Sequence, residues 1–110
     1  MPENENKNGQ AQVWSLSENP EARTVALSGE VDFTVTPKIR ERLAAFIDAT
    51  TGDVIVDLGD LEYIDSSGLA VMIEARKILA VKGRNITISS ISPQVRRLFE
   101  LTQIGDLFGL

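Results

Sequence analysis

Apolar and polar residues follow a pattern along this chain that separates predicted strands from predicted helices. Residues 13–17 and 24–28 alternate in polarity and predict two strands, joined as an antiparallel hairpin by a turn at residues 18–22, where Asn and Pro break the pattern. Residues 53–57 form a continuous β-branched run, which is typical of a strand buried on both faces. Residues 86–88 predict a fourth strand.

Three segments have helical periodicity instead. Thr36-Pro37 predicts a helix start, with the Thr36 hydroxyl as cap and Pro37 at the first helical position. Apolar residues then recur on one face to about residue 49: Ile39, Leu43, Phe46 and Ile47. A second helix is predicted over residues 66–81, with Gly83 as a left-handed residue after its end. Ser92-Pro93 predicts a third start, with an inward face of Val95, Leu98, Phe99 and Thr102. Residues 105–108 are expected to add a last short strand.

The order of these segments predicts a single α/β domain. Each strand–helix–strand unit implies a parallel pair of strands, so we expect a mixed sheet of four to five strands with an N-terminal antiparallel hairpin and helices packed on it. The polar residues 1–11 have no hydrophobic period and predict a disordered tail, which leaves residues 12–110 as the domain.

Composition and charge exclude several classes of protein. Hydrophobic residues make up 43% of the chain, so disorder throughout is not expected. A net charge of −5 argues against binding nucleic acid by neutralising its phosphates. No stretch reaches the roughly 18 apolar residues of a membrane helix, and the N-terminus lacks an apolar signal core, so we expect a cytoplasmic protein that does not insert into membranes.

The chain contains neither cysteine nor histidine. It therefore lacks a thiol nucleophile, the commonest general base and the commonest metal ligand. We expect a protein that is not an enzyme and that holds no cofactor and no metal.

The strongest candidate site is Asp65-Ser66-Ser67-Gly68, between the predicted central strand and the second helix. Asp and Ser are favoured at helix N-termini, where backbone N–H groups lack partners and the helix dipole is positive. Such a place suits a hydroxyl that becomes an anion. One interpretation is that these residues only cap the helix, and the other is that a serine among them accepts a phosphate.

Several segments carry a resemblance to a known family. Residues 58–61 and 64–69, with residues 27–32, Thr36-Pro37, Ser92-Pro93 and residues 101–102, resemble the anti-sigma factor antagonists, which typify the STAS domain. The resemblance spans roughly residues 13 to 108. It implies a STAS fold in which a partner kinase phosphorylates Ser66. It also implies two partners: an anti-sigma factor with serine kinase activity, bound only when Ser66 is unphosphorylated, and a serine phosphatase that restores the unmodified form.

We expect further residues around Ser66 to contact the partner. The resemblance places Asp32 near the phosphorylation site, although a solvated loop carboxylate is an equal interpretation. Gly68 is expected to keep the approach open for a kinase, and backbone N–H groups of the helix to hold the phosphate. An apolar flank of the helix predicts a landing patch unless the helix is buried on a wide arc. The predicted contact residues are Asp32, Asp65, Ser67, Gly68, Leu69, Ile73 and Arg76.

Two other functions remain open. STAS-like domains also serve as cytoplasmic subunits of lipid or anion transporters, and that role would not require modification of Ser66. A small hydrolase using Ser66 is disfavoured because no histidine is present to activate the hydroxyl. The sequence contains no glycine-rich phosphate loop of the kind that would indicate a nucleotide site.

Overall fold

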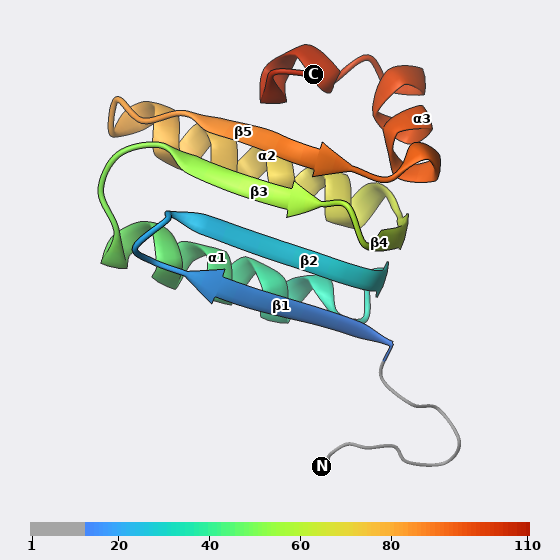
Figure 1. The fold of residues 1–110 in the computed structure, drawn as a ribbon, viewed down its shortest axis with the longest axis horizontal. Coiled ribbons are helices and arrows are strands. Elements are labelled where there is room, and N and C mark those ends of the chain that lie inside the picture. The colour runs from blue at the N-terminus through green and yellow to red at the C-terminus, as the bar shows by residue number, and fades with distance from the viewer. Residues whose placement is uncertain (1–12) are drawn as a thin grey trace.

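The computed structural model describes residues 13–110, and a five-stranded mixed sheet lies at its centre (Figure 1). The expected tail over residues 1–11 lies outside the described residues. The strands are β1 (Trp14–Asn19), β2 (Thr24–Val31), β3 (Val54–Leu58), β4 (Leu61–Ile64) and β5 (Ile86–Ile91). Their order is β1-β2-β3-β5, and β4 pairs with β2 beyond the end of β3. Only the β1–β2 pair is antiparallel among these, so the predicted hairpin and parallel units are confirmed.

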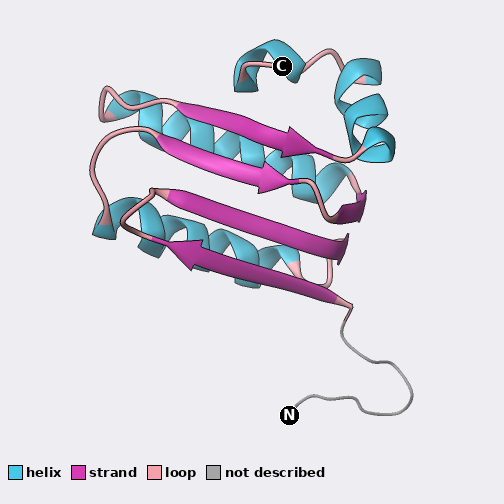
Figure 2. Cartoon of the chain, viewed as in Figure 1, coloured by secondary structure: helices cyan, strands magenta, loops and turns pink. Residues whose placement is uncertain are grey.

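Helices cover one face of this sheet. In Figures 1 and 2 both α1 (Thr36–Ala49) and α2 (Ser66–Val81) lie behind the strands, whereas α3 (Pro93–Leu101) stands at the end of β5. The chain then forms a short 3-10 helix, η1 (Gly105–Phe108), beside the outer edge of β5. Within residues 13–110, no helix has the length and apolar character needed to cross a membrane.

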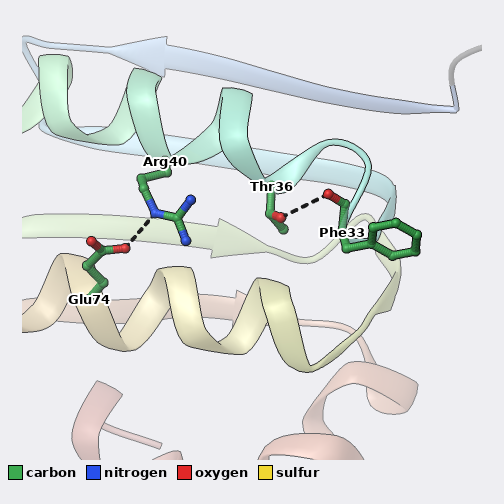
Figure 3. Close-up of polar contacts among 4 residues, drawn as sticks. All are labelled: Phe33, Thr36, Arg40 and Glu74. Atoms are coloured by element: carbon green, nitrogen blue, oxygen red, sulfur yellow. Dashed lines mark hydrogen bonds and ion pairs between the residues drawn. The ribbon is translucent and has the colours of Figure 1, made fainter.

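The core lies between the sheet and these two helices. Alternate residues of the central strands are buried on the helix side, and the stripe predicted for α1 is buried opposite them: Ile39, Leu43, Phe46 and Ile47. Helix α2 contributes Val71, Met72, Ala75 and Leu79. A salt bridge of 2.7 Å from Arg40 Nε to Glu74 Oε1 joins α1 to α2 outside the core (Figure 3). Because both side chains are about half exposed, it contributes only about 0.2–1 kcal/mol.

Three details of the sheet differ from the prediction. Residues 105–108 form a helical turn rather than a strand, because Phe108 is buried against Phe99 with ring centroids 5.7 Å apart in an edge-to-face contact. Strand β4 was not predicted. Strand β2 also continues beyond residue 28 to Val31, through an irregular register at Gly29–Glu30. Gly29 has a φ of +82°, and an added Cβ would lie 1.7 Å from the Val13 carbonyl oxygen, so only glycine fits there.

The helix ends also differ in part from the prediction. Thr36 is the first residue of α1 rather than its cap, and its hydroxyl donates to the Phe33 carbonyl at 3.4 Å (Figure 3). Thr102 is exposed rather than turned inward, because α3 ends at Leu101. Gly83 has a φ of +71° after α2, which confirms the left-handed residue expected there.

Candidate functional site

The predicted site lies at the end of the sheet that is formed by the carboxyl ends of the parallel strands (Figure 1). Strand β2 leads there into the loop before α1, β4 leads into α2, and β5 leads into α3. Ligand and partner sites of α/β sheets commonly form at the carboxyl ends of the strands, because loops from several strands converge there. Asp32, Asp65 and Ser92 follow the three strands directly.

Asp65 is the cap of α2, which settles which of the neighbouring polar residues begins the helix. Its Oδ1 accepts hydrogen bonds from the N–H of Ser67 at 3.0 Å and of Gly68 at 3.1 Å. The same oxygen accepts the Ser67 hydroxyl at 2.6 Å. Its Oδ2 accepts the N–H of Phe33 at 3.1 Å, so the carboxylate also holds the loop between β2 and α1.

These contacts shift the pKa of Asp65. Desolvation by partial burial raises this pKa, but the hydrogen bonds from the Ser67 hydroxyl and from the N–H groups of Gly68, Ser67 and Phe33 outweigh it. The net effect is a pKa below the ordinary value of an aspartate. Asp65 is therefore a carboxylate at neutral pH, fixed at the mouth of the helix.

The two serines at this helix start have different surroundings. Ser66 is exposed, and among residues 13–110 its hydroxyl has no hydrogen-bond partner. Ser67 is half-buried, and its hydroxyl donates to Asp65. A carboxylate has no proton to give, so the direction of this hydrogen bond is fixed. Ser66 therefore presents the accessible hydroxyl.

Three of the backbone N–H groups expected to hold a phosphate on Ser66 already have acceptors in the unmodified protein. The N–H groups of Ser67 and Gly68 already donate to Asp65 Oδ1. The N–H of Leu69 donates to the Asp65 carbonyl at 3.1 Å. A phosphate on Ser66 would have to displace the Asp65 carboxylate or point outward. That the helix N-terminus holds the phosphate therefore stays a prediction, and it requires these N–H groups to change acceptor.

Gly68 has a structural role at the start of α2. It is buried, and an added Cβ would lie 2.4 Å from Ile64 Cγ1 and 3.2 Å from Val31 Cγ1. The missing side chain lets the first turn of α2 pack closely on the ends of β2 and β4. The space beside its Cα is filled by residues of the same chain, and the expectation that Gly68 keeps the approach open for a kinase stays a prediction.

A groove of about 430 Å³ begins at Ser66 and runs between the start of α2 and helix α3. Most of its surface is apolar, and the residues that line it are Glu62, Tyr63, Ile64, Asp65, Ser66, Leu69, Gln94, Val95, Leu98 and Thr102. We call it the Ser66 groove. Leu69 is only 6% exposed, so it forms part of the groove wall rather than a protruding flank.

The remaining predicted contact residues lie farther from Ser66. Ile73 is partly buried against the core one turn beyond Leu69. Arg76 is half-buried, and its Nε donates to the Leu107 carbonyl at 3.1 Å, which ties α2 to η1. Neither residue lines the Ser66 groove. Asp32 accepts the Thr34 N–H at 2.9 Å and is joined to the site through its neighbour Phe33.

Two exposed aromatic side chains near the site were not predicted. Phe33 is 70% exposed in the loop that Asp65 holds, and Figure 3 shows it pointing away from the helices. Tyr63 is 52% exposed on β4 and lines the Ser66 groove. A large apolar residue inside a predicted polar loop is the sequence signal that points to Phe33. Within residues 13–110, no three acidic side chains gather closely enough to hold a metal ion.

The family model of the STAS domain matches residues 14–110 of this chain. Curated relatives include the anti-sigma-B factor antagonist of Staphylococcus epidermidis, 34% identical over 83 residues that cover 76% of this chain and 77% of the relative. The antagonist of Staphylococcus aureus strain NCTC 8325 is 32% identical over the same lengths. The chain belongs to the STAS-domain family of anti-sigma factor antagonists.

Solved structures agree on the fold. An anti-sigma factor antagonist from Mycobacterium paratuberculosis superposes with a TM-score of 0.76 at 21% identity, covering 86% of this chain and 82% of that one. The unphosphorylated form of the anti-sigma factor antagonist SpoIIAA gives a TM-score of 0.70 at 22% identity, covering 86% and 84%.

Proposed function

We propose that this protein is an anti-sigma factor antagonist that works in the cytoplasm as a phosphorylation-controlled partner switch. When Ser66 is unmodified, the protein binds an anti-sigma factor that is also a serine kinase. Phosphorylation of Ser66 by that kinase ends the interaction, and a serine phosphatase restores it. The observation that carries the proposal is the exposed Ser66 hydroxyl at the rim of an apolar groove. The names of the curated relatives support the identity of the partner.

The electrostatics of the site favour such a switch. A phosphate adds a charge of about −1.5 to −2. On Ser66 it would stand beside the Asp65 carboxylate, whose neighbouring N–H donors are already engaged. A partner that covers the groove would then have to desolvate two adjacent anions with little compensation. A loss of about 100-fold in affinity corresponds to about 2.8 kcal/mol, which is within the range for such a charge placement.

The partner surface includes the Ser66 groove in this proposal. Its apolar lining from Leu69, Val95 and Leu98 can receive an apolar side chain of the partner, and Phe33 and Tyr63 add exposed aromatic area nearby. Aromatic side chains and small apolar pockets are enriched at the energetic centres of protein interfaces. Phosphorylation at the rim would therefore act directly on the contact, without a change of fold.

The test combines a phosphosite map with partner capture from the protein's own cells. Wild type and Ser66→Ala should capture an anti-sigma factor kinase, whereas Ser66→Asp should lose it by at least about tenfold in affinity. Ser89→Asp is the matched control, because Ser89 is exposed on β5 outside the groove and receives the same charge. Mass spectrometry should find phosphate on Ser66 of the wild type.

An unmodified Ser66 under every growth condition, with a transporter complex captured instead, would overturn this proposal in favour of a transporter subunit. Equal loss of the kinase in Ser66→Asp and Ser89→Asp would also contradict it, because charge alone would then explain the loss. Turnover of an ester or phosphate substrate that Ser66→Ala abolishes would point to a hydrolase. Such activity is not expected, since no base contacts the Ser66 hydroxyl within residues 13–110.

A further inference from the structure

Ser66 and Ser67 are neighbours, and both lie in the first turn of α2. A kinase that reaches one serine could reach the other. Residue type and position in the helix therefore do not explain why only one of the two serines should be modified. Their hydroxyl groups differ in one contact: the Ser67 hydroxyl donates to Asp65 Oδ1 at 2.6 Å, and the Ser66 hydroxyl has no such partner in residues 13–110.

We propose that Asp65 is a positioning residue that directs phosphorylation to Ser66 by holding the Ser67 hydroxyl. This inference rests on the proposed function and adds how the modified serine is selected. Asp65 acts through Ser67, the N–H groups of the first turn and the loop at Phe33. The same carboxylate that begins the helix thereby removes one of two candidate acceptors.

Phosphoryl transfer requires a serine hydroxyl that can direct its proton to a base of the kinase. The oxygen of the accepting serine forms a bond to the γ-phosphorus of a nucleoside triphosphate, and the bond from that phosphorus to the β–γ bridging oxygen breaks. The nucleoside diphosphate leaves, and the hydroxyl proton passes to a base of the kinase. The Ser66 hydroxyl can meet these demands. The Ser67 hydroxyl would first have to give up its hydrogen bond to Asp65.

Asp65 does not activate Ser67 as a base in this arrangement. Hydrogen bonds from four donors stabilise its charged form, so it accepts a proton poorly. Transfer to Ser67 would also place a phosphate directly against a carboxylate whose oxygen now lies 2.6 Å from the serine oxygen. Two adjacent anions repel each other, which disfavours phosphate on Ser67. Ser67 is half-buried as well, which restricts the approach of the triphosphate.

The difference in accessibility and reactivity between positions 66 and 67 can be measured without a kinase, by placing a single thiol at each position. The chain has no cysteine, so Ser66→Cys and Ser67→Cys each introduce one reactive group. Iodoacetamide alkylation of the folded protein reports the accessible thiolate, which a helix N-terminus favours and a neighbouring carboxylate disfavours. We expect the thiol at position 66 to react at least about tenfold faster than the thiol at position 67, which corresponds to about one pKa unit between them.

Adding Asp65→Asn to each variant gives the matched control, since asparagine also caps helices. Alkylation at position 67 should then accelerate about fivefold or more, whereas the rate at position 66 should change about twofold or less. Circular dichroism shows whether each variant is folded. Equal alkylation at the two positions with Asp65 in place would overturn the inference. So would an acceleration by Asp65→Asn that is the same at both positions.

Phosphosite mapping in the protein's own cells completes the test and does not depend on the cysteine variants. Phosphate on Ser66 of the wild type, and none on Ser67 of a Ser66→Ala variant that still captures the kinase, supports the inference. Phosphate on Ser67 of that variant overturns it and leaves the proposed switch standing. Absence of phosphate from both serines of the wild type under every growth condition overturns the proposed function and this inference with it.

Discussion

The backbone N–H of Phe33 donates to Asp65 Oδ2 at 3.1 Å, so one carboxylate joins the loop after β2 to the mouth of α2. The other carboxylate oxygen holds the first turn of the helix. Phe33 is 32 residues from Asp65 in the chain, yet this contact joins the loop that carries its exposed ring to the residue before Ser66. Removal of the carboxylate should therefore lower the stability of the fold and change the position of the Phe33 loop.

Asp65→Ala should lower the free energy of unfolding by about 1–2 kcal/mol, because the first-turn N–H groups and the Phe33 N–H lose their acceptor. Urea denaturation followed by circular dichroism measures the change. Asp65→Asn is the control and should lose less, since an asparagine oxygen can still accept from the first turn. An Asp65→Ala variant as stable as the wild type would show that the cap contributes nothing to the fold.

The lowered pKa of Asp65 predicts how this contribution depends on pH. Because the folded protein binds the proton of Asp65 less readily than the unfolded chain does, the carboxylate stabilises the fold above the unfolded pKa of about 3.9. That contribution is lost as the pH falls through the lower folded pKa. The difference in unfolding free energy between wild type and Asp65→Asn should therefore be constant near neutral pH and shrink below about pH 4.

Urea unfolding at a series of pH values measures this difference for the two proteins side by side. Other carboxylates titrate in both, so they cancel in the comparison as long as they are distant from Asp65. A difference that stays constant down to about pH 3 would show that the folded pKa of Asp65 is not lowered.

Much of this architecture can be predicted from local sequence. The β-branched run that becomes β3 and the apolar stripe of α1 depend on burial and periodicity, which are visible in neighbouring residues. Both predictions are confirmed. The helix over residues 66–81 begins and ends at the predicted residues because its cap and its terminal glycine are local signals.

The errors arise where distant contacts decide the structure. Residues 105–108 become η1 because Phe108 packs against Phe99, and a four-residue run does not reveal such a contact. Strand β4 forms only by pairing with β2 in an irregular stretch. The packing of Gly68 against Ile64 and Val31 likewise depends on strands that lie before it in the chain, and local sequence does not reveal it.

Gly68→Ala should destabilise the protein even though alanine is the better helix former by up to about 1 kcal/mol. The added Cβ would lie 2.4 Å from Ile64 Cγ1 and 2.8 Å from Ile64 Cδ1, so the start of α2 must move away from β4. We expect a loss of about 1–3 kcal/mol in unfolding free energy, which is typical of overpacking. Thermal and urea unfolding both measure it.

Gly83→Ala serves as the comparison for this substitution. No atom lies within 4 Å of a Cβ added there, and the φ of +71° is the only source of strain. Its cost should be about 1 kcal/mol, from the left-handed conformation alone. Only Gly68→Ala should also alter the amide chemical shifts around Ser66. A Gly68→Ala protein more stable than wild type would mean that the packing relaxes without strain.

Ser92→Ala should weaken the attachment of α3, the helix that forms the wall of the Ser66 groove opposite α2. Ser92 is 7% exposed and directly precedes α3, and its hydroxyl donates to the carbonyl of Leu61 on β4. That bond fixes the start of α3, which carries Val95 and Leu98 into the groove. Removal of the hydroxyl leaves a buried carbonyl without this donor and should cost about 1–3 kcal/mol in unfolding free energy.

Ser89→Ala is the matched control for Ser92→Ala, because the Ser89 hydroxyl also meets a backbone carbonyl, that of Val56, but at 3.5 Å and from an exposed position. Loss of the Ser89 hydroxyl should change the free energy of unfolding by about 0.5 kcal/mol or less. Since Ser92 does not line the groove, an effect on partner affinity must pass through the position of α3. Amide shifts at Val95 and Leu98 that move in Ser92→Ala but not in Ser89→Ala would establish that route. Unchanged shifts with lost stability would make Ser92 a purely structural residue.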